Sequence, residues 1–328
     1  MAAIATDESA RCRACGNRAF NTTLVAREMM FGRRDRFEYL RCATCGGLSL
    51  VSIPDDLGAY YPPDYYSFET PVLTLRRPLV AAAKRARATV VLKMPPSIVG
   101  RLVAAGKLPV LFGWVAGLRL STASRIVDVG SGTGSLLSDF ARAGFTSLVG
   151  IDPYLEQDSA LGPISLRKLA VDELPGTSDL IMFNHSLEHV PDPGATLQAA
   201  RQRIAPAGAI LVRTPMADGY AARHYGENWI GVDAPRHMMV PTHDTMRILA
   251  TRAGLRIKRI FYDTHIQHFY GSEQYARDIP LLDERSYCVN PGRSIFSPAD
   301  IANWESRCRT LNEEGRADAA GFVLTVSP

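Results

Sequence analysis

The chain has 328 residues and a mass of 35.9 kDa, with 46% hydrophobic and 21% charged residues. This composition excludes a disordered protein and allows one full domain with an appendage. No run of 18 or more apolar residues occurs, so no membrane-spanning helix is expected. The first ten residues contain Asp7 and Glu8 and lack the apolar core of a secretory signal, which favours a cytoplasmic protein.

The net charge of +4 hides an uneven distribution. Residues 1–120 carry 17 Lys and Arg against 9 Asp and Glu, whereas residues 121–328 carry 20 against 24. The segment from Thr70 to Val127 contains ten basic residues and no acidic one. Such a segment commonly faces an anionic partner, here nucleic acid, a phosphate group or an acidic membrane surface. The alternative is a solvated helix face whose apolar side packs on the protein.

Two cysteine pairs frame the N-terminal region: Cys12 with Cys15, and Cys42 with Cys45. Each pair is separated by two residues and followed by glycine, and four thiolates at this spacing form a closed tetrahedral Zn²⁺ site. Between the pairs, Asn21–Arg27 and Phe37–Leu40 are predicted to be short strands. The pattern therefore predicts a structural zinc ribbon. A redox dithiol, the alternative, needs only one such pair.

A tyrosine-rich segment with two prolines follows, from Tyr60 to Tyr66. Prolines prevent it from continuing a helix. Its rings suit stacking on a sugar or a base, and we expect Tyr65 and Tyr66 to bind substrate. Alternatively, the segment attaches the ribbon to the next domain.

A glycine-rich turn begins the second half of the chain. A short apolar strand contains Asp128 two residues before Gly130, and Gly130, Ser131, Gly132 and Gly134 precede a helix predicted over Ser135–Ala143. A dinucleotide fingerprint would have Gly or Ala in place of Ser135, and a Walker motif would have a nearby lysine. The D-x-G-x-G-x-G pattern instead resembles motif I of class I S-adenosylmethionine-dependent methyltransferases.

Later segments agree with this resemblance in order and spacing. The resemblance covers residues 121–328 and implies an α/β fold with a Rossmann-like seven-stranded sheet whose last strand is antiparallel. The further strands and helices expected are Ser147–Asp152, Ile164–Leu166, Asp179–Asn184, Pro206–Val212, the helix Thr242–Ala253, Leu255–Tyr262, the helix Pro298–Glu314 and Gly321–Val326.

The resemblance also implies a binding site for S-adenosylmethionine. In that family the glycine turn holds the amino-acid end of the cofactor, an acid at the position of Asp152 accepts the ribose hydroxyls, and one near Asp172 meets the adenine amino group. A carboxylate has lone pairs for two such donors. The expected cofactor-binding residues are Asp128, Gly130, Ser131, Gly132, Gly134, Asp152, Asp172, Asn184 and His185.

Methyl transfer requires alignment of the acceptor and removal of its proton, a task for which histidine is suited near pH 7. The segment Asp233-Ala-Pro-Arg236-His237 follows Trp229 in a region where class I enzymes present substrate-binding residues. We predict that His237 is the base, that Asp233 orients its ring, and that Arg236 binds substrate or shapes the loop. His189 is a further catalytic candidate.

A second polar cluster is His185-x-x-Glu188-His189. Glu188 and His189 resemble part of the E-x-x-E-H cluster of some metal-dependent O-methyltransferases, but His185 replaces the first acid. We therefore do not expect a catalytic metal, and packing near the cofactor is the preferred interpretation.

The predicted organisation has three parts: a zinc-ribbon module with the tyrosine-rich segment (1–70), a basic helical linker or cap (71–120) and the catalytic domain (121–328). Residues 263–320 are an insertion before the last strand, where the minimal family has a hairpin. Insertions at such an edge often form substrate lids. We expect His268 and Tyr270, together with Trp229, to bind substrate.

The combination of ribbon, tyrosine-rich segment and Asp-Ala-Pro-Arg-His resembles bacterial methyltransferases of surface-polysaccharide and deoxysugar pathways. Sugar C-methyltransferases have a longer C-terminal domain, so the resemblance favours O-methylation of a sugar or glycoconjugate that is nucleotide-linked, lipid-linked or polymeric. An anionic membrane surface, reached from the cytoplasmic side, is a further candidate partner. The alternatives are a zinc-ribbon RNA methyltransferase, a natural-product N-, O- or C-methyltransferase and a non-catalytic binding module.

Overall fold

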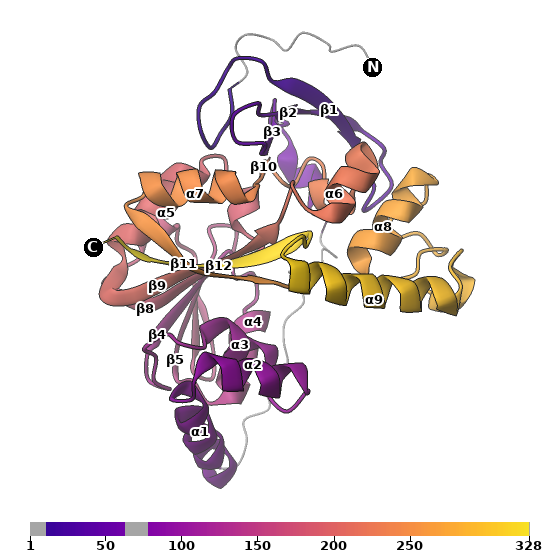
Figure 1. Cartoon of the computed structure of the whole chain (residues 1–328). Coiled ribbons are helices and arrows are strands. Elements are labelled where there is room, and N and C mark those ends of the chain that lie inside the picture. Colours follow the sequence, from indigo (N-terminus) through magenta and orange to yellow (C-terminus); the bar gives the residue numbers. More distant parts are fainter. Residues whose placement is uncertain (1–10, 63–77, 328) are drawn as a thin grey trace.

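The computed structural model describes residues 11–62 and 78–327, and Figure 1 shows how their helices and strands are arranged. The centre of the molecule is an eight-stranded sheet in the order β11-β12-β9-β8-β4-β5-β7-β6. Its strands are β4 (Arg125–Val129), β5 (Ser147–Ile151), β6 (Ser159–Leu161), β7 (Ile164–Arg167), β8 (Ser178–Asn184), β9 (Ile204–Pro215), β11 (Leu255–Tyr262) and β12 (Ala319–Val326).

The sheet confirms the predicted class I methyltransferase topology. Strands β7, β5, β4, β8 and β9 are parallel, and β12 runs antiparallel to both of its neighbours. All seven expected strands are present. The eighth strand, β6, is a three-residue edge strand antiparallel to β7 that the sequence analysis did not predict.

Helices cover both faces of this sheet, and the alternation of side chains in the strands explains why. In β8, Leu180 and Met182 pack with one face, whereas Ile181 and Phe183 pack with the other. Strands buried on both sides have near-continuous apolar sequences. The first face is covered by α1 (Pro78–Leu92), α2 (Pro96–Ala104), α3 (Val110–Val115) and α4 (Ser135–Ala143), and the second by α5 (Pro193–Gln202) and α7 (His243–Arg252).

Local capping fixes where several helices begin. Thr242 accepts a hydrogen bond from the Thr245 amide at the start of α7. Ser297 and Asp300 form a reciprocal capping box at the start of α9 (Pro298–Glu314), whose bounds match the prediction. No helix in the described ranges is long and apolar enough to span a membrane.

The N-terminal module is joined to the main body by a second, four-stranded sheet. Its order is β1-β2-β3-β10, and its strands are β1 (Thr22–Arg27), β2 (Arg36–Arg41), β3 (Leu48–Leu50) and β10 (Met239–Val240). Strand β10 belongs to the second half of the chain and pairs antiparallel with β3, so a segment just after His237 completes the sheet of the cysteine module. Figure 1 shows this sheet above the α5 and α7 layer.

The insertion before β12 folds back on the same module. It contains α8 (Gln267–Ala276) and α9, and α8 packs beside α6 (Tyr220–Tyr225). The Leu281 amide donates a hydrogen bond to the Met29 carbonyl at 2.8 Å, and Asp278 pairs with Arg27 and Arg34. The insertion therefore contacts the N-terminal module at the turn between β1 and β2.

Candidate active site

The glycine turn lies where β4 ends, at the carboxyl edge of the parallel strands. Gly130, Gly132 and Gly134 all have positive φ values, of 72°, 49° and 83°. A Cβ atom on Gly130 would lie 2.7 Å from Cβ of Ser186, so only glycine fits this close approach. The turn therefore presents bare backbone to the sheet edge.

Two acidic side chains flank this turn. Asp152 accepts hydrogen bonds from the amides of Gly132, at 3.1 Å, and Tyr154, at 2.9 Å. Asp128 is almost fully buried, and its Oδ1 has no hydrogen-bond partner among the described residues. Burial, together with the charge of Asp152, raises the pKa of Asp128 to about 8.

These features fit the amino-acid end of S-adenosylmethionine. Oδ1 of the buried Asp128 has no partner in the described part of the chain, so it can accept a hydrogen bond from the ammonium group of the cofactor. The absence of a side chain at Gly130 lets a ligand lie against the backbone of the turn. Ser131 lies within the same turn, whereas Asp172 is exposed on the 3₁₀ turn after β7. The roles of these residues toward the cofactor stay predictions.

The end of β8 adds a second polar group to this edge. His185 follows the strand with a φ of 53°, and its Nδ1 lies 3.4 Å from Oε1 of the fully buried Glu188. Burial would raise the pKa of Glu188, but His185, His237 and His189 around it outweigh this effect and lower the pKa to about 2. Glu188 is therefore an anion among three imidazoles.

His189 and His237 meet beside Glu188. Their ring centroids are 4.7 Å apart, and one ligand atom from each of these three residues lies within 4.8 Å of the others. Burial, with the charge of His237, lowers the pKa of His189 to about 4, so this ring is neutral near pH 7. The three side chains could hold a metal ion, and the expectation of metal-free catalysis stays a prediction.

His237 has one ring nitrogen engaged and one directed toward a carboxylate. Its Nδ1 lies 2.9 Å from the Gly231 carbonyl, a contact in which the nitrogen must donate. Nε2 therefore keeps its lone pair, and it lies 3.8 Å from Oδ2 of Asp233. The His237 carbonyl accepts a hydrogen bond from the Tyr39 hydroxyl at 2.9 Å, which ties this residue to β2.

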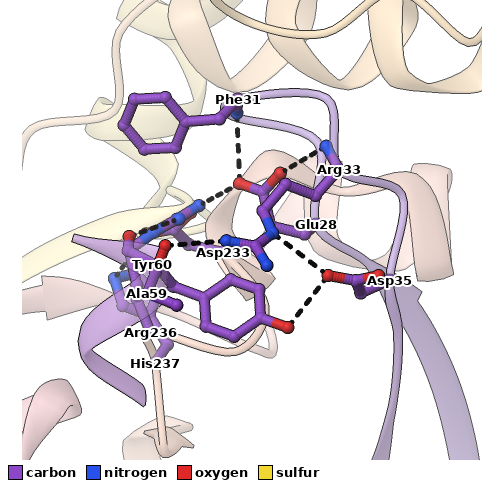
Figure 2. Close-up of polar contacts among 9 residues, drawn as sticks. All are labelled: Glu28, Phe31, Arg33, Asp35, Ala59, Tyr60, Asp233, Arg236 and His237. Carbon is purple, nitrogen blue, oxygen red and sulfur yellow. Dashed lines mark hydrogen bonds and ion pairs between the residues drawn. The ribbon is translucent and has the colours of Figure 1, made fainter. Parts of the chain in front are cut away.

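Arg236 is fully buried, and Figure 2 shows its polar contacts with the neighbouring residues. Its guanidinium donates to both oxygens of Asp233, to Oε1 of Glu28 at 3.0 Å and to the Tyr60 carbonyl at 3.1 Å. Burial lowers the pKa of Arg236, but the two carboxylates outweigh it and raise the pKa above its usual value. These contacts favour loop shaping over substrate binding for Arg236.

Glu28 comes from the turn after β1 and was not singled out in the sequence. It is fully buried and also accepts hydrogen bonds from the amides of Phe31, at 3.1 Å, and Arg33, at 3.0 Å. A lone acid in a turn gives no periodic or motif signal, so only its partner in space reveals it. Glu28 of the N-terminal module therefore helps to hold Arg236, which directly precedes the candidate base His237.

The tyrosine-rich segment reaches the site at its first residues. The Tyr61 hydroxyl lies 3.1 Å from Nδ1 of His189, whereas Tyr65 and Tyr66 lie outside the described residues. Tyr60 contributes its carbonyl to Arg236 and its hydroxyl to Asp35. Tyr61 is thus a candidate that the sequence analysis missed within a segment it had singled out.

The other predicted substrate residues lie in packed surroundings. Trp229 is 2% exposed and stacks with His268, with ring centroids 6.1 Å apart. Tyr270 is also buried and packs with Met29 and Tyr287 between the insertion and the N-terminal module. This packing favours a structural role for Trp229 and Tyr270 over direct substrate contact.

One further polar group at the strand ends was not predicted. Arg213 on β9 forms an ion pair with Asp263, donates to Oδ1 of Asn184, and lies 4.1 Å from the ring centre of Trp114 on α3. Its members come from four elements distant in sequence, which explains why no local pattern marked them. They place a cation at the same edge as the glycine turn.

The four cysteines converge as predicted. Sγ of Cys12 lies 3.6 Å from Sγ of Cys45, and Sγ of Cys15 lies 3.4 Å from Sγ of Cys42. All four sulfur atoms lie within 4.8 Å of one another. Four thiols of this kind, with a left-handed glycine after each second cysteine, fit a tetrahedral Zn²⁺ ion.

Comparison with known proteins points to methyl transfer. A family model described as a methyltransferase domain matches residues 104–260. The ubiquinone biosynthesis O-methyltransferase of Cupriavidus pinatubonensis is 33% identical over 204 residues, which cover 58% of this chain and 73% of the relative. The enzyme of the same name from Paracidovorax citrulli is 31% identical over 119 residues, 32% of this chain and only 50% of the relative.

Solved structures are similar to this chain at low sequence identity and with TM-scores below 0.5. One is the complex of the Haloferax volcanii Trm112 methyltransferase activator with a methyltransferase, at 16% identity and a TM-score of 0.44, covering 78% of this chain and 100% of that chain. Another is the cyclopropane synthase MmaA2 of Mycobacterium tuberculosis, at 16% identity and a TM-score of 0.39, covering 79% and 87%.

Proposed function

The chain belongs to the S-adenosylmethionine-dependent methyltransferases, and on this premise we propose that it methylates a hydroxyl oxygen with His237 as the general base. The observation that carries the proposal is the state of the His237 ring. Nδ1 donates to the Gly231 carbonyl, which leaves the Nε2 lone pair available to accept a proton. Oδ2 of Asp233 lies 3.8 Å from Nε2.

The cofactor supplies an electrophilic methyl group on a sulfonium when it is bound. Around it, the glycine turn and Asp128 would hold the amino-acid end, and Asp152 would hold the ribose. Glu188 would stabilise positive charge on the neighbouring imidazoles, since it is a buried anion beside His189 and His237. His189 would stay neutral and, with the Tyr61 hydroxyl, line the acceptor side.

Oxygen is the acceptor atom that the comparisons favour. The two relatives described above are named O-methyltransferases of ubiquinone biosynthesis, and neither name mentions a sugar. The sugar acceptor expected from the sequence therefore stays a prediction, as do the RNA and natural-product alternatives. We therefore propose O-methylation of a small hydroxylated acceptor without naming the compound. We also propose that the four cysteines hold a structural zinc ion.

The test is an acceptor screen with labelled S-adenosylmethionine. Simple catechols, nucleotide sugars and a short RNA are each incubated with the full chain, and products are identified by mass spectrometry. A methyl ether on a catechol or sugar supports the proposal and separates the two acceptor classes. Methylated RNA bases, or methyl groups found only on nitrogen or carbon, would refute O-methylation.

A further inference from the structure

Helices α1, α2 and α3 carry a surface that the proposed chemistry does not use. Half of the exposed large hydrophobic side chains found on the described parts of the chain lie on these three helices. They are Leu79 (85% exposed), Val80 (40%), Val90 (57%), Ile98 (37%) and Val110 (55%). Because solvent-exposed aliphatic groups normally occur singly, a group of five on 33 consecutive residues (78–110) calls for a partner.

Helix α1 has apolar residues on two opposite sides. Ala88 and Val91 are buried and pack with the sheet layer. Leu79, Ala83, Ala86 and Val90 are exposed and spaced by four, three and four residues, which places them on one stripe of the helix away from Ala88. A helix that only covers the core would have polar residues on that outer side.

The same surface is strongly basic. Six exposed cations lie on or next to the three helices, and the whole segment from 70 to 127 contains no acidic residue. These cations are Arg85, Arg87, Lys93, Arg101, Lys107 and Arg119. Arg87 and Arg85 lie on opposite sides of the outer apolar stripe of α1, and Lys93 directly follows the end of this helix.

A groove beside α1 extends this basic character toward the body of the protein. It has a volume of about 430 Å³ and runs between α1, α3 and α4. Lys84, Arg87 and Arg142 line it, and its one acidic residue, Asp139, is paired with Arg142 at 2.8 Å. Trp114, which also lines the groove, packs over Arg213 at the strand ends. One end of the groove, at Trp114, therefore contacts the polar group at the strand ends.

We propose that α1–α3 form a docking surface for an anionic lipid bilayer, with the outer stripe of α1 inserted at the interface and the flanking Arg and Lys residues on the lipid phosphates. Exposed aliphatic side chains with cations at their edges are the arrangement found in interfacial helices. RNA is also anionic and would be attracted to the same cations. Proteins bind RNA through phosphate contacts and aromatic stacking, however, and the aliphatic side chains of Leu79 and Val90 would add little to its affinity. The exposed aliphatic stripe therefore favours the bilayer.

Vesicle co-sedimentation of the full chain tests membrane docking without any methyl-transfer assay. A negative result would therefore count against membrane docking and leave the proposed methyltransferase function untouched. The protein should bind vesicles of phosphatidylglycerol and phosphatidylcholine but not of phosphatidylcholine alone. Binding should weaken at least tenfold between 0.1 and 0.5 M NaCl, since the phosphate contacts are screened.

Two double variants separate the contributions. Leu79→Glu with Val90→Glu, and Arg85→Glu with Lys93→Glu, should each weaken vesicle binding at least tenfold while leaving the thermal midpoint unchanged, because all four side chains are exposed. The matched control, Val289→Glu with Ile295→Glu, changes exposed aliphatic residues on the insertion and should bind as the parent does.

Three results would overturn the proposal. They are no binding to anionic vesicles at low salt, equal binding by the Leu79/Val90 variant and the parent, and tight binding of a short RNA that anionic vesicles do not compete for. The last result would assign the surface to nucleic acid.

Discussion

The glycine turn after β4 and the loop that carries His237 are built in different ways. The turn is specified by residues close together in sequence: three glycines with positive φ, and Asp128 one residue before the end of β4. The loop depends on Arg236, which is held by Glu28 and Tyr60 from the N-terminal module. The cofactor side should therefore tolerate changes in the N-terminal module, and the acceptor side should not. Four predictions test this contrast, from the largest expected effect to the smallest.

Replacing His237 by alanine should lower kcat by about 10²–10⁴-fold, the usual contribution of a positioned general base. Binding of S-adenosylhomocysteine, measured calorimetrically, should change by less than about twofold, because the glycine turn is untouched. His224→Ala, an exposed histidine outside the cluster, is the matched control and should keep full turnover. Full turnover by the His237 variant would disprove the base assignment.

Replacing Arg236 by alanine should lower the free energy of unfolding by about 3–5 kcal/mol, because it leaves Glu28 and Asp233 buried without their cation. Chemical denaturation measures this loss. Adding Glu28→Gln should recover part of it, since one unpaired buried charge is then removed. Strictly additive losses in the double variant would show that the two side chains are not coupled.

Replacing Cys42 by serine should remove the proposed zinc ion and lower the free energy of unfolding by at least about 2 kcal/mol. Metal content measured by mass spectrometry and a thermal melt give the two readouts. Because β10 joins the cysteine module to the His237 loop, turnover should fall more than cofactor affinity. Cys288→Ser changes an exposed thiol outside the cluster, and it should change neither the metal content nor the melting temperature. A zinc-free parent protein would refute the zinc site.

Replacing Asp128 by asparagine should alter how stability depends on pH. The folded-state pKa of Asp128 is raised to about 8, so between pH 4 and pH 8 the unfolded chain loses a proton that the folded chain keeps. This group therefore makes the parent less stable as pH rises across that range, by at most about 1.4 kcal/mol per pH unit. The variant should gain thermal stability relative to the parent from pH 5 to pH 8 and bind S-adenosylhomocysteine more weakly. A constant difference in melting temperature would contradict this.

The elements that were predicted well are those with a long local signal. Helix α9 has a capping box at one end and Gly315 at the other, and five of the eight residues of β11 are apolar or aromatic. Strands β3 and β10 were missed because two or three residues show no periodicity and exist as strands only through their pairing. The short edge strand β6 was missed for the same reason.

The candidate site divides in the same way. The order of strands, the glycine turn, the convergence of the four cysteines and the family to which the chain belongs were all determined by the sequence, because each depends on residues close together or in a fixed order. Only the tertiary structure decided that Glu28 reaches the His237 loop, that Tyr61 reaches His189, that Arg236 is buried between two carboxylates, and that Trp229 packs with His268. The physical reason is that a buried charge or ring takes its role from the partners that desolvate and pair with it. Here those partners lie up to 208 positions away along the chain.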